Sequence, residues 1–127
     1  MSFAGRYELQ SRENFEAFMK VIGVSDDVVE KAKQLKTVTE IQQDGNHFVT
    51  IITTGSHVNR NEFTIGEETE LQTPTGGKAR GTVNLEDGKL VSTVAGMTTV
   101  TEVSGDTLIA VATLKDVVYK TISKKIS

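Results

Sequence analysis

The residues that could do chemistry are few and poorly spaced for catalysis. The two histidines, His47 and His57, each lie beside a glycine-marked turn, and no third ligand at short spacing completes a zinc site. Glu68 and Glu70 fall on one face of an expected strand, where neighbouring carboxylates are usually solvated. The segment 76–78 lacks the remaining glycines and the hydroxyl of a phosphate-binding loop. The sequence therefore predicts a protein that is not an enzyme and needs neither cofactor nor metal.

A second set of side chains that could take part in binding is basic. It belongs to the helical part of the chain, and the stretch 14–35 is the one segment with helical periodicity. An apolar stripe predicts a first helix that Gly23 ends, and Ser25 is a candidate N-cap for a second. We place Lys31, Lys33 and Lys36 on that second helix. They form either an ordinary solvated face or a contact for anionic ligand heads or an anionic membrane, with the helix pair as a lid.

The rest of the chain predicts strands. Alternating apolar and polar residues are separated by turn signals such as Asp44-Gly45 and Asp87-Gly88, at the spacing of an antiparallel sandwich or barrel. A first strand surrounds Tyr7 and Leu9, and the others are expected at 37–43, 47–54, 58–64, 67–73, 80–85, 89–94, 98–103, 107–113 and 117–122. We predict a mainly all-β fold of about ten antiparallel strands in one domain over residues 1–127.

Composition narrows the function further. The net charge of −3 and the lack of basic runs argue against nucleic-acid binding, and the chain has no cysteine for a disulfide or thiolate site. No apolar run approaches the length of a membrane span, and the first residues do not resemble a secretion signal. We therefore expect a cytoplasmic protein, and a monomer, because no strand looks like a long apolar edge.

The expected inner face is unusually rich in hydroxyls. With the phase set by Ile41, Phe48 and Phe63, the polar residues on that face are Thr39, Thr50, Asn61, Thr73, Thr101, Thr121 and Ser123. A dry core seldom holds so many hydroxyls, because each buried one needs a hydrogen-bond partner. We interpret the interior as hollow and partly wet. The alternative is that some strands are out of phase and these hydroxyls face solvent.

Several segments carry a resemblance. Gly5–Leu9 and Asn14–Met19 resemble the N-terminal signature of the intracellular lipid-binding proteins, the family of fatty-acid-binding and bile-acid-binding proteins. The likeness runs along the whole chain. Segments that resemble the liver-type branch are 13–20, 61–64, 66–68, 100–102 and 122–124, whereas 28–33 and 39–45 are similar to the ileal bile-acid-binding branch.

The resemblance implies a flattened ten-stranded antiparallel β-barrel, or β-clam, capped by a helix-turn-helix and enclosing a lipid cavity. Carried over by position, the expected ligand-binding residues are Thr39, Ile41, Phe48, Thr50, Ile52, Phe63, Thr73, Leu90, Val94, Thr101, Ala110, Tyr119, Thr121 and Ser123. The expected portal residues are Phe18, Val28, Lys31, Thr54, His57 and Pro74.

The polar anchors of the family are missing. Thr121 stands where the family usually has a carboxylate-binding arginine, and Ala110 where the liver-type branch has an asparagine. Each buried methylene contributes about 0.8 kcal/mol, so a long acyl chain outweighs one charge-assisted hydrogen bond of about 1.5–3 kcal/mol. We therefore expect lipid binding to survive with a weaker head-group preference.

The resemblance implies a carrier of fatty acids or similar amphipaths, with a bile-acid-binding protein of the same family as the alternative. Transient membrane contact through the helical cap is part of that expectation. A second alternative is a protein-interaction or signalling module in which lipid is only the trigger, and an enzyme is a third reading that no constellation of residues supports.

Overall fold

A computed structural model describes residues 3–72 and 77–127. Two helices, α1 (Phe15–Val21) and α2 (Asp26–Gln34), follow the first strand, β1 (Gly5–Glu13). The other strands are β2 (Thr37–Asp44), β3 (His47–Thr54), β4 (His57–Thr64), β5 (Glu68–Gln72), β6 (Lys78–Glu86), β7 (Lys89–Val94), β8 (Met97–Ser104), β9 (Thr107–Leu114) and β10 (Val117–Lys125).

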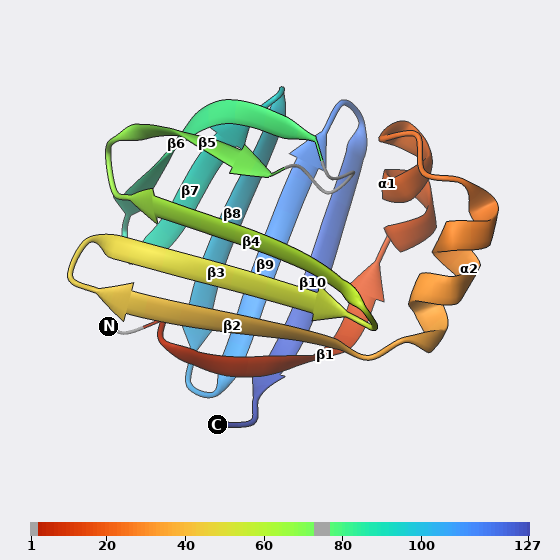
Figure 1. Ribbon diagram of the computed structural model, residues 1–127, viewed down its shortest axis with the longest axis horizontal. Coiled ribbons are helices and arrows are strands. Elements are labelled where there is room, and N and C mark those ends of the chain that lie inside the picture. Colours follow the sequence, from red (N-terminus) through yellow and green to blue (C-terminus); the bar gives the residue numbers. More distant parts are fainter. Residues whose placement is uncertain (1–2, 73–76) are drawn as a thin grey trace.

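The strands form one antiparallel sheet in the order β4-β3-β2-β1-β10-β9-β8-β7-β6-β5. The sheet curls into a nearly closed barrel, with the helices at the end where β1 finishes and β2 begins (Figure 1). The predicted ten-stranded barrel with its helix-turn-helix cap is confirmed. Among the described residues, no helix has both the length and the apolar character needed to cross a membrane.

The two edge strands, β4 and β5, meet through side chains. The backbone N–H of Gln72 donates to Asn61 Oδ1 at 2.6 Å, and the N–H of Arg60 donates to Gln72 Oε1 at 3.1 Å. Asn61, which the sequence predicted on the inner face, therefore uses its side-chain amide to bond the backbone of Gln72 and so joins β4 to β5. These contacts satisfy backbone groups that an open sheet edge would leave without partners.

The helical cap differs in detail from the sequence expectation. Ser25 is the N-cap of α2, although its side chain makes no capping hydrogen bond. The helix ends at Gln34, so the placement of Lys36 on it was wrong. Val28 and Leu35 have the spacing of an apolar stripe together with Val29 and Ala32, yet they are 53% and 46% exposed. Val29 is the buried residue of α2, and Leu35 already has an extended backbone as the C-cap.

Strand β1 contains a β-bulge that changes which side chains face inward. Leu9 pairs with Ser123 of β10, but the next paired residues are Ser11 with Ile122 and Arg12 with Thr121. Gln10 is therefore the additional residue, and the alternation of faces reverses after it. Leu9 and Arg12 consequently lie on the same face of the barrel.

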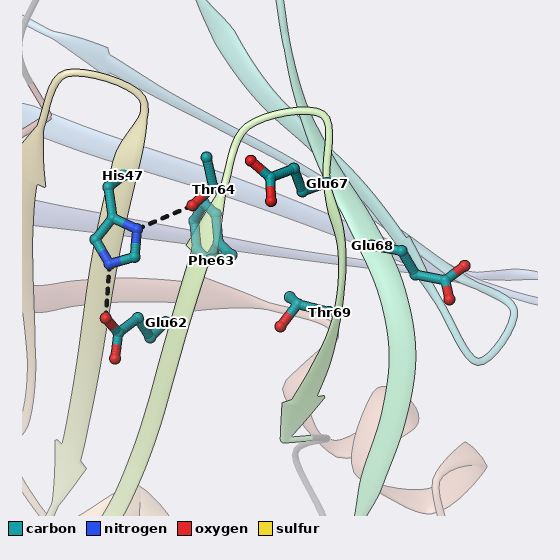
Figure 2. Close-up of a pocket in the computed structure, with 7 residues that line it drawn as sticks. All are labelled: His47, Glu62, Phe63, Thr64, Glu67, Glu68 and Thr69. Carbon is teal, nitrogen blue, oxygen red and sulfur yellow. Dashed lines mark hydrogen bonds and ion pairs between the residues drawn. The ribbon is translucent and has the colours of Figure 1, made fainter.

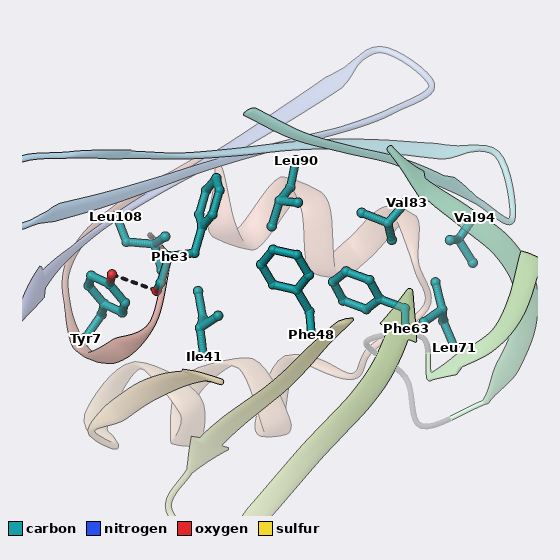
Figure 3. Close-up of a cluster of buried hydrophobic side chains, with 10 residues drawn as sticks. All are labelled: Phe3, Tyr7, Ile41, Phe48, Phe63, Leu71, Val83, Leu90, Val94 and Leu108. Atoms are coloured by element: carbon teal, nitrogen blue, oxygen red, sulfur yellow. Dashed lines mark hydrogen bonds between the residues drawn. The ribbon is translucent and has the colours of Figure 1, made fainter. Parts of the chain in front are cut away.

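A buried apolar cluster fills part of the interior (Figure 3). Its members are Phe3, Tyr7, Ile41, Phe48, Phe63, Leu71, Val83, Leu90, Val94 and Leu108. Phe48 stacks on Phe63 with ring centroids 5.4 Å apart, and Phe3 meets Phe48 edge-on at 5.9 Å. Because Phe48 is the second residue of β3 and Phe63 is the second-last residue of β4, these rings pack at the end of the barrel away from the helices (Figure 1).

Candidate ligand-binding site

One row of side chains crosses five strands on the inner face. Thr121 of β10 pairs with Ala110 of β9, Ala110 with Thr101 of β8, and Thr101 with Leu90 of β7. Arg12 of β1 pairs with Thr121 and begins the row. Four of these five positions were expected from the sequence to bind ligand. The row thus runs from the cationic Arg12, past the small side chains of the two threonines and the alanine, to Leu90, which belongs to the buried cluster.

The neighbouring strands carry the other expected positions in the same phase. Thr39 pairs with Ile52, Ile41 with Thr50, and Phe48 with Phe63. Paired residues in an antiparallel sheet share a face, so the predicted phase is confirmed for these residues. Thr39 and Thr50 are only partly buried, and Ile52 is 39% exposed although it shares a face with buried Ile41.

Ser123 and Val94 complete the described part of the expected set. Ser123, 4% exposed, is a buried polar residue and pairs with the buried Leu108. Val94 belongs to the apolar cluster. Thr73 and Pro74 lie outside the described residues. Ligand contact by every residue of this set stays a prediction.

Aromatic rings close the mouth of the barrel beneath the cap. Phe18 of α1 is 2% exposed and stacks on Tyr119 of β10, with centroids 4.9 Å apart. Phe15 approaches the same tyrosine at 5.8 Å. Burial raises the pKa of Tyr119 above its ordinary value, and the nearby positive charge of Arg12 opposes that rise. Phe18, expected at the portal, is therefore a buried part of the lid.

Arg12 is the residue that sequence reasoning missed. Its Nη2 donates to Thr37 Oγ1 at 3.2 Å, and that hydroxyl shares a hydrogen bond of 3.0 Å with the Thr54 hydroxyl. The guanidinium carbon lies 4.2 Å from the centroid of the Phe15 ring, a cation–π contact. Simple alternation in β1 places Arg12 on the outer face with Arg6, so no signal in the sequence indicated its inward position.

The turn between β3 and β4 lies against the C-cap of α2. The side chain of Leu35 packs over Gly55 in the turn between β3 and β4, where a Cβ would meet it at 2.8 Å. Thr54 and His57 flank that turn as a pair. Val28, His57 and Lys31 are exposed, so these side chains lie on the outer surface.

Two of the predicted cap cations are neutralised by carboxylates. Lys33 forms an ion pair with Glu16 of α1, which joins the two helices, and a second one with Glu30 within α2. Lys36 lies 3.1 Å from Glu8 of β1. These ion pairs are typical of an ordinary solvated helix surface. Contact with anionic ligand heads or an anionic membrane stays a prediction, which now rests on Lys31.

Two clefts open on the surface. One, of about 310 Å³, lies between β4 and β5, where His47 bonds Glu62 at 2.6 Å and Thr64 at 2.9 Å (Figure 2). The hydrogen bond from His47 is the main cause that lowers the pKa of Glu62. The other cleft, of about 490 Å³, is lined by Arg12, Asn14, Phe15, Glu16, Ala17 and Lys33. Neither is an enclosed chamber within the barrel, so the hollow interior stays a prediction.

Comparisons with known proteins match the whole chain. The model of the lipocalin / cytosolic fatty-acid binding protein family matches residues 1–127. The chain is 57% identical to fatty acid-binding protein 1, liver, of Ambystoma mexicanum, over 98% of this chain and 100% of that protein. It is 52% identical to the liver fatty acid-binding protein of Sus scrofa, over 99% of this chain and 100% of that protein.

A solved structure shares the architecture. The zebrafish ileal bile acid-binding protein complexed with cholic acid is 36% identical, with a TM-score of 0.85. The match covers 98% of this chain and 98% of that protein.

Proposed function

This chain belongs to the lipocalin / cytosolic fatty-acid binding protein family, and from that premise we propose that it is a non-catalytic carrier of fatty acids. It acts as one cytoplasmic lipid-binding domain, holds the acyl chain inside the barrel and transfers it between membranes and enzymes. The observation that carries the proposal is the inner row of Thr121, Ala110 and Thr101. These small side chains lie on an inner face that also carries the buried apolar cluster, and this combination suits a long hydrocarbon.

Fatty acids are the favoured ligand because the liver-type relatives, named for them, are 57% and 52% identical to this chain. A bile acid is the alternative, and one observation favours it. The 36% identical ileal protein, whose structure holds cholic acid, shares the fold over nearly its full length.

Two further features of the carrier follow from the surface. Exposed Val28 and Leu35 beside Lys31 give the cap an apolar and basic patch, which suits transient contact with an anionic membrane. The protein acts as a monomer, because the edge strands β4 and β5 already bond each other through Asn61 and Gln72.

Calorimetric titration of the delipidated protein tests the proposal. Oleate and glycocholate are titrated separately under the same conditions. We expect saturable oleate binding tighter than glycocholate binding, since the flexible acyl chain can bury its apolar area against the apolar cluster of the interior. Tighter binding of glycocholate would favour the bile-acid alternative, and binding of neither would overturn the carrier function.

A further inference from the structure

The arginines of this chain divide by the face of the barrel on which they lie. On the outer face they pair with glutamates: Arg6 with Glu40 at 3.9 Å, Arg60 with Glu62 at 3.4 Å and Arg80 with Glu68 at 2.8 Å. Arg12 lies on the inner face and has no carboxylate partner among the described residues. Its positive charge is therefore not neutralised by the protein.

The surroundings of Arg12 satisfy this side chain only in part. Thr37 accepts one of its hydrogen bonds, and the ring of Phe15 covers the guanidinium carbon. Its Nε is buried and lacks a hydrogen-bond partner within the described part of the chain. A guanidinium offers five N–H donors in a planar fork, and leaving a buried donor unpaired is costly. A small anion at this position would accept a hydrogen bond from Nε, the donor that the protein leaves unpaired.

Arg12 stands at one end of the inner row. Its neighbours along the inner row, Thr121 and Ala110, carry short side chains. Beyond them, Thr101 and Leu90 lead to the buried apolar cluster. A molecule with a charged head at Arg12 and a hydrocarbon tail along this row would meet matching chemistry at both ends.

We infer that Arg12 binds the carboxylate of a fatty acid held in the barrel, an inference that rests on the proposed carrier function. A guanidinium fork can donate two parallel hydrogen bonds to the oxygens of a carboxylate. The hydroxyls of Thr121 and Thr37 lie beside it as further polar groups for the head. The head group thus lies beneath the helical cap, and the tail points toward Phe48 and Phe63.

A competing role is purely structural. Regular pairing of β1 with β2 is described for Gly5 to Glu8, and the hydrogen bond from Arg12 to Thr37 bridges the two strands beyond it. In that case Arg12 contributes to the fold and not to the recognition of charge. The two roles differ in how they respond to an uncharged ligand of the same length.

The test compares oleate with oleyl alcohol on three proteins by calorimetry. The proteins are the wild type, Arg12→Gln and the control Arg6→Gln. The control removes the same charge from the same strand, but from the outer face. We expect Arg12→Gln to raise the dissociation constant for oleate about tenfold and to leave that for oleyl alcohol within about twofold. Arg6→Gln should bind both ligands as the wild type does.

Each outcome decides between the roles. An equal loss for both ligands in Arg12→Gln, or a loss for neither, would overturn the inference while the carrier function stands. A wild type that binds neither ligand would overturn the carrier function and the inference with it. Cholate, titrated in parallel, identifies the source of the carboxylate, because a loss confined to cholate would overturn the assignment to a fatty acid.

A measurement on the wild type alone removes any dependence on how the variants fold. Oleate labelled with ¹³C at its carboxyl carbon and α-methylene is bound to the protein and studied by NMR. We expect contacts from the α-methylene protons to the rings of Tyr119 and Phe15, and a carboxyl pKa below the ordinary value for a carboxylic acid. Contacts to Phe48 and Phe63 in their place would overturn the inference.

Discussion

Two groups of aromatic residues lie at the two ends of the barrel and differ in the side chains that surround them. Far from the helices, Phe3, Phe48 and Phe63 are 2%, 1% and 7% exposed. Their rings contact one another, Phe3 with Phe48 and Phe48 with Phe63. Beneath the cap, Phe15 covers the guanidinium group of Arg12, and Phe18 stacks on Tyr119. The same guanidinium group donates to Thr37, whose hydroxyl bonds that of Thr54. We call these the far-end cluster (Phe3, Phe48, Phe63) and the mouth cluster (Arg12, Phe15, Phe18, Tyr119).

The difference separates stability from recognition. The far-end cluster gains its free energy from apolar area removed from water, which needs no ligand. The mouth cluster holds a charge whose donors are only partly satisfied, a state that weakens the free protein and favours an anionic partner. Substitutions at the two ends should therefore affect different measurements.

The largest expected effect is at the far end. Phe48→Ala should lower the free energy of unfolding by about 3–5 kcal/mol, because it deletes a buried ring and leaves a cavity between Phe3 and Phe63. The matched change Phe15→Ala removes a partly exposed ring from the mouth and should cost about 1–2 kcal/mol. Urea unfolding of both variants measures the losses, and equal losses would contradict the division between the ends.

A smaller effect concerns the two tyrosines of the chain, Tyr7 and Tyr119. Burial raises the pKa of both phenols, whereas Arg12 opposes the rise for Tyr119 alone. The Arg12→Gln change should therefore move one ionisation step, followed by absorbance near 295 nm, to higher pH and leave the other in place.

The raised pKa values of the two tyrosines also predict how the stability of the protein changes at alkaline pH. A phenol with a raised pKa in the folded state contributes stability that is present below its unfolded pKa and is lost as pH rises through the folded value. The free energy of unfolding of the wild type should thus fall above about pH 10. Steps that move together in Arg12→Gln, or do not move, would show that Arg12 has no local effect on Tyr119.

The smallest expected effect lies on the outer face behind the far-end cluster. His47 lowers the pKa of Glu62, so their contact contributes stability that is present above the unfolded pKa of the carboxyl. That contribution is lost as pH falls from about 4.5 through the lowered folded value. Thermal unfolding of Glu62→Gln should lack this acid-dependent loss, which stays slight because the pair is exposed. A large difference in unfolding temperature between Glu62→Gln and the wild type would show that exposed ion pairs contribute much of the stability at this end of the barrel.

Much of the architecture could be predicted from the sequence. The alternation through Ile41, Phe48 and Phe63 set the phase of the inner face, because a side-chain period of two fixes which residues share a face. Turn residues such as Asp44-Gly45 marked where strands end. The cap was less predictable, since Val28 and Leu35 have the spacing of a buried stripe but lie exposed at the mouth.

The sequence by itself determined the strand pattern, the presence of two helices after the first strand and the inward hydroxyls, because each follows from local periodicity and turn chemistry. Only the tertiary structure decided the place of Arg12. The β-bulge at Gln10 is defined by pairing with β10, more than a hundred residues later in the chain, and local alternation carries no record of it. One additional residue in one strand thus moved an arginine from the solvent face to the barrel mouth.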